Sequence, residues 1–274
     1  MKLAFGISPC PNDVWAFAGL LSGAVRVPGV ELAFELHDIQ RLNESFREGR
    51  LPIAKTSFLA ALQARRPLVV LRRGSALGFG VGPILVGRRD APPAEQARVL
   101  LPGANTTAAL LFRLHGGPSG RVEQALFSEI LPRLAAGDAD LGVCIHEGRF
   151  VYQRFGLDLV RDLGEAWERD TGGPLPLGGI VADATLAPEL VAACDEALLA
   201  SLDWARSHAE EALALCRRHA QELDEEVLRR HIELYVNART FDLGAEGRAA
   251  LDALWSRARS CGMLEADAPP LRVR

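Results

Sequence analysis

Short apolar runs alternate with helical patterns along the first part of the chain. The runs at 3–7, 30–36 and 51–55 each precede a segment whose apolar residues recur every three or four positions. The alternation resumes with the runs at 98–102 and 139–145. Strands separated by helices of roughly ten to fifteen residues indicate βαβ units and parallel pairing. The pattern therefore predicts an α/β fold, which amphipathic helices complete toward the C-terminus.

A glycine-rich segment, 74–96, interrupts the alternation. It lacks the G-x-G-x-x-G spacing and the following helix of a dinucleotide-binding loop, so we interpret it as a crossover between two lobes. We expect a discontinuous larger α/β domain formed by 1–86 and 181–274, with 87–180 inserted as a smaller α/β domain. Ligands bind in the cleft between such lobes, and binding drives hinge closure.

Composition and charge argue against some classes of partner. The 274 residues carry a formal net charge of −4, with no basic stripe for a nucleic acid. Five cysteines are scattered without a C-x-x-C pair, which is typical of reduced thiols in a cytoplasmic protein. The first apolar run is too short for a signal-peptide core, and no stretch reaches membrane-spanning length. We expect neither nucleic acid nor membrane as a partner.

The stretch FGISPCPND, which ends at Asp13, joins the first apolar run to a stiff turn. Its two prolines fix φ and remove two amide donors. Asn12 or Asp13 is placed to cap the helix that follows. In open α/β sheets, ligands bind at the carboxyl ends of the strands, so this turn is expected to form one wall of the cleft. Cys10 lies there too, with no histidine nearby in sequence to activate it.

Two helix starts carry small polar residues. PGANTTAALLFRL places Thr106 and Thr107 at a predicted N-terminus, where hydroxyls and free N–H groups suit a carboxylate or phosphate. Plain N-capping by Asn105 or Thr106 is the alternative. AKTSFLAAL repeats the arrangement, with Ser57 as the cap and Lys55 beside it. Helix starts on opposite lobes could hold one anionic ligand from both sides.

The stretch DLGVCIHEGRF ends an apolar strand in His146, where an imidazole could serve as a general base. The alternative is a structural histidine hydrogen-bonded at a strand terminus. A zinc-binding HExxH motif is excluded because Phe150 occupies the second histidine position, and no metal site is expected. His208, His219 and His231 have no metal-ligand spacing on their predicted helices, and we interpret them as surface or interface residues.

Several stretches together resemble the 1,4-dihydroxy-6-naphthoate synthases of menaquinone biosynthesis. In chain order they are SPCPND, LNESFREGRLPIAKTSF, SALGFGVGP, PGANTTA, GVCIHEGRF and LPLGGI. The resemblance implies a type II periplasmic-binding-protein-like fold, with two parallel or mixed sheets flanked by helices around a central cleft. It also implies a cytoplasmic lyase that needs no cofactor and converts cyclic dehypoxanthine futalosine to 1,4-dihydroxy-6-naphthoate by carbon–carbon cleavage.

The family's IHE histidine falls on His146, which the resemblance makes the base that starts the cleavage. A small-molecule carboxylate is the expected substrate. The substrate-binding positions expected from the motifs and the resemblance are Asn12, Asn43, Lys55, Thr56, Ser57, Asn105, Thr106, Thr107 and Ile145. The alternatives are a solute-binding or ligand-sensing protein of the same fold, or the sister enzyme chorismate dehydratase. Trp204, Tyr235 and Trp255 on the C-terminal helices offer a face for a homodimer.

Overall fold

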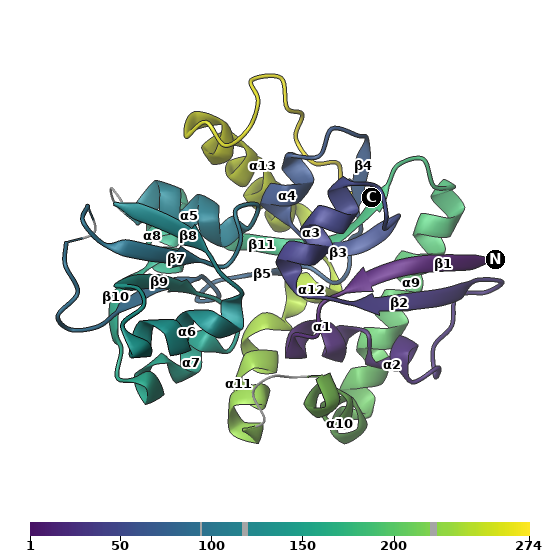
Figure 1. Cartoon of the computed structure of the whole chain (residues 1–274). Helices are drawn as coiled ribbons and strands as arrows, with labels where there is room; N and C mark the ends of the chain where they lie inside the picture. The colour runs from purple at the N-terminus through teal and green to yellow at the C-terminus, as the bar shows by residue number, and fades with distance from the viewer. Residues whose placement is uncertain (94, 117–119, 220–223) are drawn as a thin grey trace.

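The computed structural model describes residues 1–93, 95–116, 120–219 and 224–274. Two β-sheets lie side by side, and helices cover both of them (Figure 1). The strands of the first sheet are β1 (Lys2–Ile7), β2 (Glu31–Leu36), β3 (Ile53–Ser57), β4 (Leu68–Val70), β5 (Ala76–Gly78) and β11 (Leu175–Asp183). The strands of the second sheet are β6 (Ile84–Gly87), β7 (Arg98–Leu101), β8 (Arg121–Gln124), β9 (Leu141–Cys144) and β10 (Asp158–Asp162).

Both sheets are mixed. The first has the order β2-β1-β3-β11-β4, and β5 also pairs with β11. β1 runs parallel to β2 and β3, whereas β11 runs antiparallel to β3, β4 and β5. The second has the order β10-β6-β9-β7-β8, in which β7 is parallel to β8 and β9 while β6 is antiparallel to β9 and β10. The predicted pair of parallel or mixed sheets is confirmed.

The helices follow the predicted alternation and then fill the C-terminal part. Between strands lie α1 (Pro11–Ala16), α2 (Ala18–Leu21), α3 (Ile39–Arg47), α4 (Phe58–Leu62), α5 (Thr107–His115), α6 (Phe127–Ala136), α7 (Gly148–Val151), the 3₁₀ helix η1 (Tyr152–Phe155) and α8 (Leu163–Thr171). After β11 come α9 (Pro188–Ser207), α10 (Ala209–His219), α11 (Glu225–Tyr235), α12 (Ala238–Phe241) and α13 (Gly244–Ser260).

Apolar side chains form a core on each face of the sheets. One cluster joins β1 to α1, α2 and α9, including Phe5, Phe17 and Leu202. A larger cluster joins α3, α4 and α13 to α5 and α8, so it continues from the first sheet to the second. A third packs α6 against the other face of the second sheet. Burial on both faces fits the near-continuous apolar runs of the central strands.

Strand direction brings the predicted motifs together. β1 and β3 are parallel, so the turn after β1 and Ser57 at the end of β3 meet at one edge of the first sheet. β7 and β9 are also parallel, so the loop before α5 and His146 meet at one edge of the second. These two edges form the site described below.

The chain passes between the sheets twice, from β5 to β6 and from β10 through α8 to β11. At the first crossing Gly82 lies so close to Gly164 that a Cβ on Gly82 would come within 2.1 Å of the Gly164 Cα. The glycine is thus required by packing against α8. The predicted domain limits lie inside β6 and β11, beyond the two crossings, and the domain division stays a prediction.

Within the described ranges, no helix combines the length and the apolar character needed to cross a lipid bilayer.

Candidate functional site

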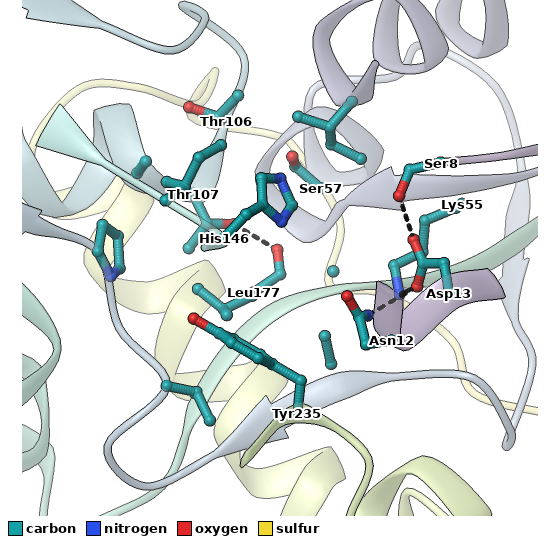
Figure 2. Close-up of a pocket in the computed structure, with 17 residues that line it drawn as sticks. Ser8, Asn12, Asp13, Lys55, Ser57, Thr106, Thr107, His146, Leu177 and Tyr235 are labelled. Carbon is teal, nitrogen blue, oxygen red and sulfur yellow. Dashed lines mark hydrogen bonds and ion pairs between the residues drawn. The ribbon is translucent and has the colours of Figure 1, made fainter. Parts of the chain in front are cut away.

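A cavity lies between the two sheets, and both contribute to its wall (Figure 2). It contains about 620 Å³ of space free of protein atoms, counting its open mouth. Its lining residues are Ser8, Asn12, Asp13, Ile39, Lys55, Ser57, Ala76, Val81, Pro83, Thr106, Thr107, Ala108, Ile145, His146, Leu177, Gly178 and Tyr235. A few polar groups converge on a mostly apolar wall, which is typical of a small-molecule site.

Most of the sequence-predicted positions meet at this cavity. Those that line it are Asn12, Lys55, Ser57, Thr106, Thr107, Ile145 and His146. Three others, Asn43, Thr56 and Asn105, are not part of the lining. Thr56 lies between Lys55 and Ser57 on β3, and successive strand side chains point to opposite faces, so its side chain points away from the cavity.

Asn43 and Asn105 support the wall from behind. The Asn43 side chain accepts a hydrogen bond from the Ser57 backbone N–H at 2.8 Å and donates to Ser57 Oγ at 3.1 Å. The Asn105 side chain accepts a hydrogen bond from Arg47 and donates one to Gln63, which ties the loop before α5 to α3 and α4. Both asparagines therefore position the lining without reaching the cavity.

A buried polar network forms the wall at the stiff turn. Asp13 accepts hydrogen bonds from Ser8 Oγ at 2.6 Å, Asn12 Nδ2 at 2.9 Å and Lys55 Nζ at 2.5 Å. The expectation that Asn12 or Asp13 caps the helix is wrong, because α1 begins at Pro11 with Cys10 as its N-cap residue. Asp13 instead balances the Lys55 charge, so the ion pair adds no net charge to the wall.

The Asp13 carboxylate also fixes its neighbours' orientation. An ionised carboxylate only accepts hydrogen bonds, so the Asn12 amide nitrogen must face it and the amide oxygen must face away. That oxygen lies 2.9 Å from His231 Nε2, which therefore carries the proton as donor. Burial, with the nearby His146, keeps the pKa of His231 well below its usual value, so its ring is neutral.

The interpretation of His231 as a surface or interface residue is wrong, and Tyr235, one of the three residues expected on a homodimer face, is not at the surface. His231 is fully buried, and Tyr235 is only 5% exposed and lines the cavity. Their rings pack together with centroids 4.5 Å apart, one helical turn apart on α11. Val227, Leu228, His231 and Tyr235 recur at the spacing of one helix face, and this pattern in the sequence could have predicted that both side chains are buried. His208 and His219 are exposed, as expected. The homodimer stays a prediction.

His146 is partly exposed at the cavity and lies two residues after Cys144, the last residue of β9. Among non-glycine residues of the described chain it alone has a positive φ, 53°. Such strain persists where the surrounding structure enforces it, often at functional sites. Desolvation of the ring lowers its pKa to about 4, although the Asp13 carboxylate opposes the shift. The imidazole is therefore neutral near pH 7.

Both predicted helix starts are present, but only the one at Thr106 is capped by its side chain. Ser57 holds the N-cap position of α4, but its side chain makes no capping hydrogen bond. Thr106 does cap α5, accepting from the Ala109 N–H, while Thr107 Oγ1 donates to the Leu177 carbonyl at 2.7 Å. No described residue accepts a hydrogen bond from the backbone N–H of Thr107 or Ala108. The N-terminus of α5 therefore presents two N–H donors at the cavity wall.

Across the part of the chain that the structure describes, no cluster of three or more histidine, cysteine, aspartate or glutamate side chains is arranged to hold a metal ion. The cavity itself offers hydrogen-bond donors, the ion pair of Lys55 with Asp13 and the neutral imidazole of His146.

Solved structures with a similar fold include a protein from Archaeoglobus fulgidus, 27% identical, with a TM-score of 0.90 over 96% of this chain and 98% of that one. The periplasmic aliphatic sulphonate binding protein of Escherichia coli has a TM-score of 0.67 at 12% identity, covering 100% of this chain and 94% of its own. At that identity the likeness concerns the fold alone. The predicted periplasmic-binding-protein-like fold is confirmed.

Sequence comparisons extend over nearly the whole chain. A family model described as menaquinone biosynthesis matches residues 3–260. A 1,4-dihydroxy-6-naphthoate synthase of Thermus thermophilus is 45% identical over 271 residues, which is 99% of both chains. A second, of Streptomyces coelicolor, is 37% identical over 273 residues, covering 97% of this chain and 96% of its own. The chain therefore belongs to the 1,4-dihydroxy-6-naphthoate synthase family, whose members are enzymes of menaquinone synthesis.

Proposed function

We propose that this protein is a lyase that converts cyclic dehypoxanthine futalosine to 1,4-dihydroxy-6-naphthoate by base-initiated carbon–carbon cleavage. The observation that carries the proposal is the neutral imidazole of His146 at the cavity between the sheets. The full-length similarity to named 1,4-dihydroxy-6-naphthoate synthases supports the product.

In the proposed step, His146 takes a proton from a substrate hydroxyl. The carbon–oxygen bond becomes a carbonyl as the adjacent carbon–carbon bond breaks, and the bonding electron pair stays with the aromatic fragment. The proton then returns to the atom that received this pair, so the imidazole ends neutral. A well-placed base contributes about 10²- to 10⁴-fold to such a rate.

A carboxylate on the substrate fits the α5 side of the cavity. Thr107 and Ala108, whose backbone N–H groups have no described acceptor, line the cavity at a helix N-terminus, where the helix dipole favours negative charge. The Ser57 hydroxyl accepts from Asn43, which leaves its own proton for a ligand oxygen. Lys55 donates to Asp13 and to the Gly74 carbonyl, so one of its three N–H groups remains for a ligand.

We also propose that the reaction takes place in the cytoplasm. All five cysteines are free thiols, and four of them are buried. Free thiols at this number suit a reducing compartment.

Substrate identity is tested by incubating the purified protein separately with cyclic dehypoxanthine futalosine and with chorismate and following the products by mass spectrometry. The proposal predicts 1,4-dihydroxy-6-naphthoate and a sugar-derived fragment from the first compound, and unchanged chorismate. Loss of water from chorismate would instead support the sister dehydratase. Binding of the first compound without turnover would support a solute-binding or sensing protein.

A further inference from the structure

Two constrained turns meet beside the cavity. Cys10 lies between Pro9 and Pro11, and its backbone N–H donates to Ser8 Oγ at 3.2 Å. The prolines fix φ on either side of the cysteine, so the backbone that carries the thiol is stiff. Opposite it stands His146, held with a positive φ of 53°. Both side chains thus project from constrained backbone.

The two side chains are in contact across the sheets. Cys10 Sγ lies 3.5 Å from His146 Nε2, joining the turn after β1 to the turn after β9. Phe127 packs edge-on against the imidazole with ring centroids 5.0 Å apart. Burial raises the pKa of the Cys10 thiol well above its usual value, and the Glu147 and Asp13 charges add to the shift. The sulfur is therefore a neutral thiol, which is a poor nucleophile.

The two nitrogens of His146 have different surroundings. Nε2 contacts Cys10 Sγ. Nδ1 has no hydrogen-bond partner among the described residues, and it is not one of the described polar atoms that are both unpaired and fully buried. Figure 2 shows the ring projecting among the lining side chains. Nδ1 is therefore the nitrogen open to the cavity. A neutral imidazole carries one proton, so a base that acts through Nδ1 must carry that proton on Nε2.

We propose that Cys10 is a positioning residue whose sulfur accepts a hydrogen bond from His146 Nε2–H and keeps the Nδ1 lone pair directed into the cavity. The inference rests on the proposed function, because it assigns the base of that reaction to one nitrogen. When Nδ1 takes up a proton, the ring becomes an imidazolium, and the same sulfur accepts from its Nε2–H. Cys10 is 5% exposed and outside the cavity lining, so it acts through His146 and does not touch the substrate.

The kinetic test compares Cys10→Ala and Cys10→Val with Cys216→Ala. Cys216 is also buried, and its thiol contacts the Pro11 carbonyl at 3.4 Å, so it supports the same turn without touching His146. Both Cys10 variants should lower kcat about 10- to 100-fold with KM within twofold, because misalignment of a reacting group costs about that much. The Cys216 variant should keep kcat within twofold. Wild-type kcat in Cys10→Val would show that the thiol only fills space.

The tautomer is measured directly by ¹⁵N NMR of the unliganded chain, with the His146 signal assigned by loss in His146→Asn. The wild type should carry the proton on Nε2, and Cys10→Ala should distribute it over both nitrogens. If that variant does not fold, Cys10→Val serves in its place. A wild-type proton on Nδ1, or an unchanged tautomer in the Cys10 variants, would overturn the inference. Absence of turnover in the wild type, with the tautomer as described, would instead refute the proposed function.

Discussion

The desolvated imidazole of His146 should make the free energy of unfolding depend on pH. Its pKa falls from 6.5 to about 4 on folding, because desolvation disfavours the charged ring. As pH drops, the unfolded chain therefore binds this proton first, and stability decreases with falling pH. The contribution is fully present above about pH 6.5 and is lost progressively as pH approaches 4. Between pH 7 and pH 5 the loss reaches at most about 2 kcal/mol, since the ring is partly exposed at the cavity.

Urea unfolding at pH 7 and pH 5 measures this loss in wild type and in His146→Asn. Asparagine does not titrate, so the variant should lose up to about 2 kcal/mol less than the wild type over this interval. Burial is the larger cause of the lowered pKa of His231 and acts in both proteins, so the His231 contribution should change little. His208→Asn, at an exposed position, serves as the matched control and should behave as wild type. Equal losses in wild type and His146→Asn would refute the burial of this ring.

Other changes test the wall of the cavity and the crossing between the sheets. Asp13→Asn leaves the Lys55 ammonium buried without its carboxylate, and urea unfolding should show a loss of about 3–5 kcal/mol. His231→Phe removes the donor to the Asn12 amide oxygen, so stability should fall by about 1–3 kcal/mol and KM should rise as the amide loses its orientation. Gly82→Ala forces a Cβ against the α8 backbone, and thermal unfolding should report a loss of about 1–3 kcal/mol. If a variant is as stable as the wild type, the contact that its substitution removes or crowds does not contribute as described.

The sequence predicted the alternation of strands and helices because local periodicity carries it. Strands such as β1 and β7 and the long C-terminal helices all appear where apolar spacing placed them. It also placed His146 correctly at a strand end, since that depends only on neighbouring residues. The pairing of the strands could not be predicted in the same way. β11 runs antiparallel through the first sheet, and its direction depends on contacts between segments that are distant in the sequence.

The site shows the same limit. Asn12 and His231 are 219 positions apart in sequence and 2.9 Å apart in the fold. A helical pattern indicates that one face of α11 is buried, yet it does not reveal which polar group that face meets. Cys10 likewise has no histidine nearby in the sequence, and its partner His146 comes from the other sheet. Asn12 was expected to cap the first helix, but its amide group forms hydrogen bonds with Asp13 and His231 instead.

The role of His146 as the base is decided by the kcat of His146→Asn with cyclic dehypoxanthine futalosine. Asparagine keeps a polar side chain of similar size but cannot take up the proton. If His146 is the base, kcat should fall about 10²- to 10⁴-fold with KM little changed. A kcat close to that of the wild type would contradict the assignment of His146 as the base.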